Sequence, residues 1–294
     1  MLTSGIHNFS KQESLVYGRP AHEVLLEDCR ASGWRRAFVI TSRSVGETPF
    51  FRKVTSALEG RLVGQYGGVT AHSPMGSVLE GSIAARNADA DLLIAIGGGS
   101  VVDAAKLMQA AIWHDLRTMT DLESYREQPK PQATPPALRM VAVPTTLSAA
   151  EFTPVAGITD TKRAIKHIFA NPYLVPRAVI LDPEATRPTP ERLFLATGVR
   201  AVDHCVETLC SASPTPYGNA MAREGLRLLT SGLRAVKADP GDLAARLDCQ
   251  LGAWIAISGP VSGVALGASH AIGRVLGAAC DVPHGETSCV LLPG

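Results

Sequence analysis

The sequence predicts an α/β domain with a doubly wound parallel sheet, followed by an all-helical domain. Two observations carry this prediction. Up to residue 182, short apolar runs alternate with helical patterns, as successive strand–helix units do. From residue 191 onward, no strand-length alternation appears and helical patterns follow one another. We place the boundary near residue 185, which gives an α/β domain over 1–185 and a helical domain over 186–294.

The expected elements follow from apolar periodicity and from glycine, proline and polar residues at their ends. Strands are predicted over 14–18, 37–41, 62–66, 92–96, 139–143 and 178–182. Helices are predicted between them over 21–32, 50–62, 75–88 and 100–114, and a polar loop with four prolines over 123–136. In the second half, helices are predicted over 191–211, 217–237, 242–258 and 261–279, and again from residue 286.

The most informative stretch surrounds three consecutive glycines. The apolar run 92–96 is typical of a buried parallel strand. Gly97, Gly98 and Gly99 have no Cβ, so a bulky anion can approach the backbone closely. We expect Ser100 to cap the following helix, whose free N–H groups would face a phosphate or pyrophosphate. A tight turn without a ligand explains a glycine triplet about equally well.

Composition limits the class of protein. The net charge of +1 gives no electrostatic argument for a nucleic-acid partner or an anionic membrane. Six scattered cysteines without a Cys-x-x-Cys pair do not predict disulfides or a cysteine zinc site, and they fit the cytoplasm. No signal peptide is expected at the N-terminus. Residues 249–269 are uncharged, but two buried helices broken at Gly259-Pro260 explain them better than a membrane span.

Two further stretches predict a binding site. Residues 144–154 follow a predicted strand and are rich in hydroxyl groups, at the end of a parallel strand where α/β proteins bind ligands. In the helical half, His204, His270 and His284 are each flanked by small residues. Three such histidines suit zinc or ferrous iron, or catalysis, although a single buried histidine is more often a core residue.

Together these motifs resemble the iron-containing (group III) alcohol dehydrogenase family, and in particular its maleylacetate reductase branch. The resemblance covers nearly the whole chain. It rests on Gly97-Gly-Gly-Ser with Asp103 and Lys106, Pro144-Thr-Thr with Glu151-Phe-Thr-Pro154, the segment 198–207, and His270 followed by Pro283-His284-Gly285.

The resemblance implies both a fold and a function. The fold would be a Rossmann-like domain followed by a helical domain, in the dehydroquinate synthase-like architecture. The function would be NAD(P)-dependent hydride transfer to or from a small alcohol, aldehyde or keto acid, including maleylacetate, in a cytoplasmic homodimer. Because family members continue through several more helices, we expect the chain to be C-terminally truncated, or a partner to cover its apolar end.

The resemblance also implies where the cofactor binds, with the pyrophosphate over the glycine turn. The residues expected at the cofactor are Gly97, Gly98, Gly99, Ser100, Asp103, Thr145, Thr146, Ser148, Ser42 and Lys162. Ser42 stands where many family members place an aspartate that selects NAD, so NADP is not excluded. Lys162 also fits a solvated loop, and Asp103 with Lys106 also fits a simple helix pair.

The metal site implied by the family departs from its usual pattern of one aspartate and three histidines. Arg200 replaces the aspartate, and Arg274 replaces a further histidine. Arginine has no lone pair for a metal, and Asp203, about 100° around the helix from His204, is a poor substitute. This argues against iron or zinc at His204, His270 and His284.

The two arginines favour an anionic substrate instead. Arg200 or Arg274 would bind a substrate carboxylate, and His204, His270 or His284 would polarise the keto oxygen or donate its proton. Ion pairing of these arginines with Asp203 or Glu207 explains them nearly as well. Two other functions stay open: a dehydroquinate synthase-like lyase that uses NAD catalytically, and a catalytically impaired nucleotide-binding remnant.

Overall fold

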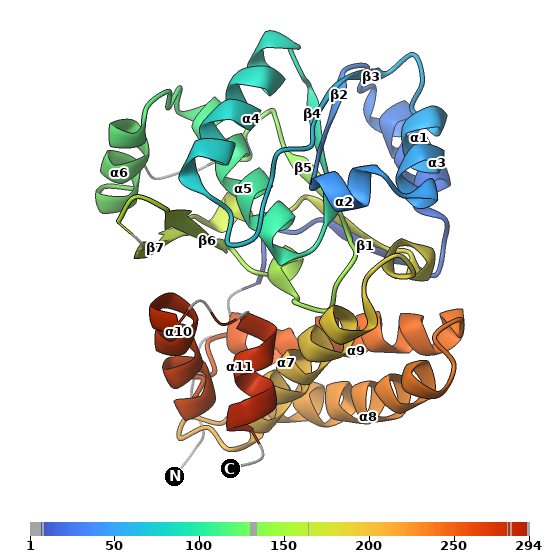
Figure 1. Ribbon diagram of the computed structural model, residues 1–294, viewed down its shortest axis with the longest axis vertical. Coiled ribbons are helices and arrows are strands. Elements are labelled where there is room, and N and C mark those ends of the chain that lie inside the picture. Colours follow the sequence, from blue (N-terminus) through green and yellow to red (C-terminus); the bar gives the residue numbers. More distant parts are fainter. Residues whose placement is uncertain are drawn as a thin grey trace.

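The computed structural model describes residues 7, 9–129, 134–163, 165–280, 282 and 284–292, without the side chains of residues 274, 277–279 and 284. The chain forms a sheet-containing part and a helical part, one above the other (Figure 1). The sheet has six strands in the order β1-β8-β5-β4-β2-β3. They are β1 (Ser14–Tyr17), β2 (Ala37–Thr41), β3 (Leu62–Tyr66), β4 (Leu92–Gly97), β5 (Met140–Pro144) and β8 (Ala178–Leu181).

All neighbouring strands of this sheet are parallel, and helices cover both of its faces. Strands β2, β4, β5 and β8 are buried along their whole length, which is why they read as unbroken apolar runs. One face packs against α1 (Ala21–Ser32) and α3 (Pro49–Ala57), the other against α4 (Met75–Asn87) and α5 (Gly99–Trp113). This confirms the predicted doubly wound parallel sheet.

Four helices and strands of the α/β part were not predicted. A short helix, α2 (Arg43–Gly46), follows β2, and α3 ends at Ala57 instead of Leu62. Helix α6 (Met119–Glu127) begins inside what we expected to be connecting sequence and runs into the predicted polar loop. Its signal was the capping box, in which Thr118 and Asp121 each bond the other's backbone N–H. Strands β6 (Val155–Asp160) and β7 (Ile165–Ala170) form an antiparallel hairpin beside the main sheet.

The second part consists of helices throughout its described residues. They are α7 (Glu191–Leu209), α8 (Pro216–Ala238), α9 (Leu243–Val261), α10 (Ala268–Cys280) and α11 (His284–Leu291). The predicted break at Gly259-Pro260 was wrong. Helix α9 runs to Val261 with Pro260 in its last turn, and the chain reverses at Gly263, whose φ is 106°. In the described part of the chain, no helix has the length and apolar character needed to cross a membrane.

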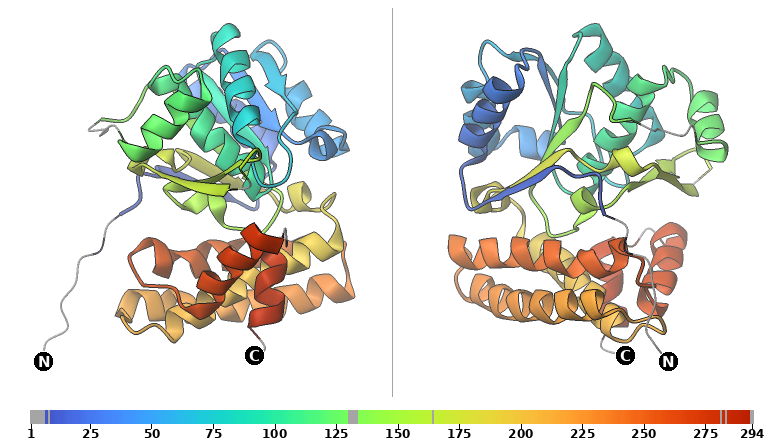
Figure 2. Two further views of the ribbon diagram at one scale, coloured as in Figure 1. Left: turned by 60° about the vertical axis from the view of Figure 1, so that its left-hand side comes forward. Right: turned by 180° about the vertical axis from the view of Figure 1, so that it is seen from behind.

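The two parts remain separate layers when the molecule is turned (Figure 2). Strand β8 ends at Leu181 and α7 begins at Glu191, with a short 3₁₀ turn, η3 (Pro183–Thr186), between them. The position of the domain boundary near residue 185 stays a prediction.

Helices α8 and α9 approach closely because glycines face the contact. A Cβ on Gly232 would lie 2.8 Å from Cys249 Sγ and 3.0 Å from the Ala245 carbonyl oxygen. A Cβ on Gly225 would lie 3.0 Å from the Ala256 backbone nitrogen. The crossing therefore requires the absence of side chains at these positions.

We expect Gly232→Val to lower the free energy of unfolding by about 1–3 kcal/mol, because the added atoms would press against the backbone of α9. The matched control is Gly76→Val, since a Cβ there would meet nothing within 4 Å. That variant should stay within about 0.5 kcal/mol of the parent. Urea denaturation of the three proteins measures both effects, and equal stabilities of the two variants would contradict the packing argument.

Candidate active site

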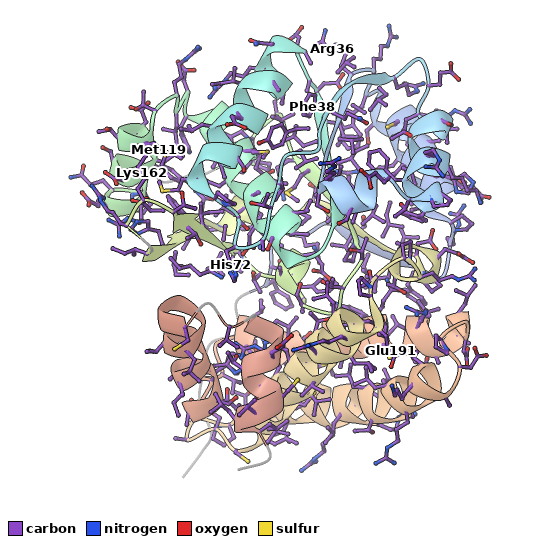
Figure 3. The ribbon with its side chains drawn as sticks, viewed as in Figure 1. Arg36, Phe38, His72, Met119, Lys162 and Glu191 are labelled. Atoms are coloured by element: carbon purple, nitrogen blue, oxygen red, sulfur yellow. The ribbon has the colours of Figure 1, made fainter. Side chains whose placement is uncertain are left out.

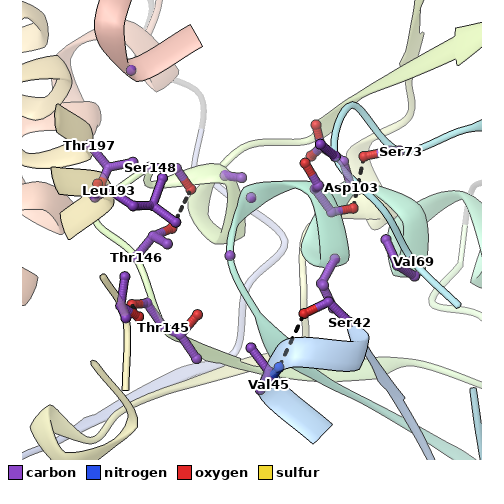
Figure 4. Close-up of a pocket in the computed structure, with 18 of the residues that line it drawn as sticks. Ser42, Val45, Val69, Ser73, Asp103, Thr145, Thr146, Ser148, Leu193 and Thr197 are labelled. Carbon is purple, nitrogen blue, oxygen red and sulfur yellow. Dashed lines mark hydrogen bonds between the residues drawn. The ribbon is translucent and has the colours of Figure 1, made fainter. Parts of the chain in front are cut away.

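A cavity of about 1060 Å³ lies between the carboxyl ends of the sheet strands and the helical part. Its walls come from segments that are far apart in sequence (Figure 4). The sheet side contributes residues of 42–50 after β2, 69–73 after β3, 98–103 at the glycine turn and 145–153 after β5. The helical side contributes Thr197, Arg200 and His204 of α7, His270 of α10 and Gly285 of α11.

The residues of the glycine turn have different structural roles. Gly98 is the N-cap of α5 and Gly99 its first residue, so the prediction of Ser100 as the N-cap was wrong and Ser100 lies inside the first turn. Gly98, Gly99 and Ser100 line the cavity. A Cβ on Gly97 would lie 2.6 Å from Val101 Cγ2, so this glycine lets the strand and helix pack closely. The first N–H groups of α5 have no acceptor within the helix and are available to an anion.

The hydroxyl-rich loop after β5 lies directly on this turn. A Cβ on Gly98 would be 2.9 Å from Thr146 Cγ2, and one on Gly99 would be 2.8 Å from Ser148 Oγ. Thr145, Thr146 and Ser148 all line the cavity. The loop is also tied to α7, because the Leu147 N–H donates to Thr197 Oγ1 at 3.1 Å. The structure thus brings together the glycine and hydroxyl residues that the sequence singled out.

Asp103 and Lys106 do more than pair along a helix. The fully buried Lys106 Nζ donates to the carbonyl oxygens of Ala150 and Val155, both at 2.6 Å, and to Thr153 Oγ1 at 3.1 Å. Asp103 Oδ2 accepts from the Gly157 N–H at 2.9 Å. Together these two side chains fasten the 3₁₀ turn η1 (Ala150–Phe152) and strand β6 to α5. Asp103 also lines the cavity, as its expected role at the cofactor requires.

Of two further residues expected at the cofactor, one lines the cavity and the other lies outside its lining. Ser42 lines it, at the end of β2. Lys162 is exposed and lies outside the described lining, on the side of the molecule that carries Met119 (Figure 3). Lys166 on β7 lines the cavity instead, which the sequence did not predict because the hairpin was not recognised. The role assigned to Lys162 stays a prediction that this geometry does not favour.

The helical wall is organised around a buried carboxylate. Asp203 Oδ2 accepts from Ser269 Oγ and Ser288 Oγ, each at 2.7 Å, and lies 3.6 Å from Arg200 Nη1. Arg200 Nη1 also donates to Ser288 Oγ at 2.7 Å. Asp203 therefore joins α7 to α10 and α11 while Arg200 reaches the cavity. Arg200 pairs with Asp203, which confirms the expected ion pair, and it also lines the cavity. Its role at a substrate carboxylate stays a prediction.

His270 is held by a second carboxylate that the sequence did not single out as a site residue. Its Nδ1 contacts Glu207 Oε2, and its backbone N–H donates to Glu207 Oε1 at 3.3 Å. The rings of His204 and His270 stack with centroids 4.8 Å apart. Burial and the Arg200 guanidinium lower the pKa of His270, while Glu207 and Asp203 oppose them. His270 Nε2 is buried without a hydrogen-bond partner among the described residues, and His270 lines the cavity.

The described side chains do not fit the metal site that the resemblance implies. Ligand atoms of Asp203, Glu207 and His270 do lie within 4.8 Å of one another. However, Asp203 Oδ2 is already shared by two serines and Arg200, and His270 Nδ1 faces Glu207. A divalent ion there would also sit beside a permanent guanidinium cation. The side chains of His284 and Arg274 lie outside the described residues, so their expected roles stay predictions.

Comparison with known proteins gives one consistent family. Residues 12–183 match the model of the iron-containing alcohol dehydrogenases, and residues 194–294 match the model of the C-terminal part of that family. A maleylacetate reductase from Burkholderia cepacia is 32% identical over 281 residues, which cover 95% of this chain and 71% of the relative. Dehydrogenase ALT3 from Alternaria alternata is 35% identical, over 89% of this chain and 72% of the relative. The crystal structure of maleylacetate reductase from Agrobacterium tumefaciens superposes with a TM-score of 0.82 at 26% identity. The match covers 99% of this chain and 75% of that chain.

Glu151, next to the Lys106 contacts, predicts a pH dependence of stability. Burial raises the pKa of Glu151 to about 7, from an ordinary value of 4.5. The unfolded chain thus loses this proton at lower pH than the folded chain, so stability falls as the pH rises from about 4.5 to about 7. The loss totals about 3 kcal/mol, since one pKa unit corresponds to about 1.4 kcal/mol.

We expect Glu151→Gln, which stays neutral, to remove this part of the pH dependence. The free energy of unfolding of the variant relative to the parent should rise between pH 5 and pH 8, by up to about 3 kcal/mol. Denaturant titrations at several pH values measure the difference. Glu59→Gln, at an exposed position, is the control. A Glu151 variant whose stability runs parallel to that of the parent at every pH would contradict the assignment.

Proposed function

The chain belongs to the iron-containing alcohol dehydrogenase family, and we propose that it reduces a small keto acid of the maleylacetate type with NADH or NADPH. Its membership and its maleylacetate reductase relatives make it an NAD(P)-dependent oxidoreductase. Substrates of the alcohol and aldehyde type are consistent with the family. The keto acid is the narrower part of the proposal.

The sheet side of the cavity supports cofactor binding. Backbone N–H groups at Gly98, Gly99 and Ser100 suit the pyrophosphate, because they have no hydrogen-bond acceptor within the helix. The two glycines also have no Cβ that would keep a ligand away from the backbone. The hydroxyls of Thr146 and Ser148 flank the same surface and can bond the sugar or phosphate oxygens. A reduced nicotinamide bound here would supply the hydride.

The helical side supports an anionic substrate, and Arg200 is the observation that carries this part. Arg200 lines the cavity with its guanidinium held by Asp203 and Ser288. The carboxylates Asp203 and Glu207 are buried behind it, so the wall facing the cavity presents a cation and two imidazoles. A keto acid matches this wall, with its carboxylate at Arg200 and its carbonyl oxygen at a histidine.

His270 is the residue we propose as the proton donor. In its protonated form, Nδ1–H donates to Glu207 and Nε2–H is free to donate to the keto oxygen. Transfer of that proton would leave a neutral imidazole that still donates Nδ1–H to Glu207. The guanidinium of Arg200 and the burial of His270, which lower its pKa, make the imidazolium a stronger acid. His204 stacks on His270 and supports its orientation.

Family membership favours this reductase over the lyase alternative. Activity separates the proposed reductase from the catalytically impaired remnant. Binding of NAD(P)H without turnover of maleylacetate or short aldehydes would favour the remnant.

We also propose a cytoplasmic homodimer. Six free cysteines support a reducing compartment. The outer edge of β1 pairs with no other strand among the described residues, so a second copy can cover it. Light scattering measures the oligomeric state, and a monomer would contradict the dimer.

We expect Arg200→Met to raise the KM for maleylacetate by about tenfold to a hundredfold, because charge-assisted hydrogen bonds contribute about 1.5–3 kcal/mol. Steady-state oxidation of NAD(P)H measures it. Arg227→Met, an exposed arginine paired with Glu224, is the control and should leave KM unchanged. Since loss of Arg200 leaves Asp203 buried without its cation, Arg200→Lys is measured in parallel with the melting temperatures. An unchanged KM in a folded Arg200→Met protein would refute the substrate contact.

We expect purified protein to contain iron and zinc well below one ion per chain, and to keep its activity after dialysis against a chelator. The reason is that Arg200 and the two serines already satisfy Asp203. Elemental analysis before and after incubation with Fe²⁺ or Zn²⁺ measures occupancy. One ion per chain with activity lost to the chelator would show that a metal site forms after all.

A further inference from the structure

We propose that the end of strand β2 selects NADPH over NADH, with Ser42, Arg43 and Ser44 binding the 2′-phosphate of the adenosine ribose. This inference rests on the proposed binding of the cofactor in the cavity. It goes further by naming one of the two cofactors and the residues that recognise it.

The position of these residues follows from the sheet. Strands β2 and β4 are neighbours, and Thr41 is in register with Ile96, one residue before the glycine turn. Thr41 Oγ1 donates to the Ile96 carbonyl oxygen at 2.8 Å, which fixes the two strand ends side by side. A dinucleotide with its pyrophosphate on the glycine turn places its adenosine ribose at the end of the adjacent strand. In this chain that end is Ser42, Arg43 and Ser44, all of which line the cavity.

The chemistry at this end favours a phosphate over a free ribose hydroxyl. An acidic side chain here would accept hydrogen bonds from the ribose hydroxyls and repel a 2′-phosphate, whereas an arginine accommodates the phosphate. Ser42 offers a hydroxyl where such a carboxylate would stand, and its Oγ lies 3.3 Å from Ser44 Oγ. Two adjacent hydroxyls and a guanidinium make a donor set for a dianion. Figure 4 shows Ser42 across the pocket from Thr146 and Ser148.

One acidic residue lies close enough to compete, and its hold on Arg43 is weak. Glu47 Oε1 accepts from Arg43 Nε at 3.2 Å, one helical turn away, and the Arg43 side chain is 90% exposed. Exposed pairs of this kind contribute little to stability, so a phosphate dianion can replace Glu47 as the partner of Arg43. The other acid in the cavity lining, Asp103, accepts hydrogen bonds from the Gly157 N–H and from Lys106.

The local fold makes the deciding substitution structurally mild. Ser42 is the N-cap of α2, and its Oγ accepts from the Val45 N–H at 3.4 Å. Aspartate is an equally good N-cap, so Ser42→Asp keeps this contact while adding the carboxylate that selects NADH. Arg43→Gln removes only the cation. Arg36→Gln, at the opposite end of β2 and paired with Asp89, is the matched control outside the cavity.

The test compares kcat/KM for NADPH and NADH in the parent and the three variants, together with calorimetric binding of adenosine 2′,5′-bisphosphate and adenosine 5′-monophosphate. The parent should favour NADPH, and the bisphosphate, by about tenfold or more. Arg43→Gln should lower this preference by about tenfold, Ser42→Asp should reverse it, and Arg36→Gln should retain it.

A parent that favours NADH and the monophosphate overturns the proposal, as does a preference that Arg43→Gln and Ser42→Asp leave unchanged. The binding arm needs no turnover. If maleylacetate is not reduced but the bisphosphate still binds more tightly than the monophosphate, the proposed substrate fails while the cofactor selection stands.

Discussion

The buried ammonium group of Lys106 is the contact on which the shape of the cavity depends. It is fully enclosed and cannot be solvated, so burial lowers its pKa and makes its hydrogen bonds to the protein obligatory. Its acceptors belong to η1, Thr153 and β6, three successive pieces of the chain after the hydroxyl-rich loop. Because the donor sits on α5, the loop and hairpin are fixed relative to the helix whose first turn faces the cavity. The sheet side of the site is thereby a rigid surface rather than a set of independent loops.

The two walls of the cavity act through different chemistry. The sheet side presents backbone N–H groups at the glycine turn and hydroxyls on the loop after β5, which can bind oxygen-rich ligands. The helical side presents a guanidinium and imidazoles whose countercharges, Asp203 and Glu207, are buried behind them. This layering keeps these two carboxylates out of the cavity wall while holding Arg200 and His270 in fixed positions.

The fold was predictable where buried strands leave unbroken apolar runs in the sequence. The site was predictable where glycine or hydroxyl residues directly follow a strand. The apolar runs of β2, β4 and β5 predicted the parallel sheet, and Gly98, Gly99 and Thr146 meet as their motifs indicated. Hairpin β6–β7 escaped prediction because exposed positions of β7 carry the apolar Ile165 and Ile168 while a buried one carries His167, which obscures the alternation. The contacts of Asp203 and Glu207 escaped for another reason. Helix periodicity shows only that Asp203 points away from His204, and not that α10 and α11 bring Ser269, His270 and Ser288 to that other face.

The serines that bond Asp203 have a consequence for how sites of this kind can change. Exchanging Arg200 for an aspartate would not rebuild a metal centre in a single step. It would place a third carboxylate beside Asp203 and Glu207 and remove the cation that now offsets them. Ser269 and Ser288 would still bond the lone pairs of Asp203. The exchange of Arg200 alone would therefore be unfavourable.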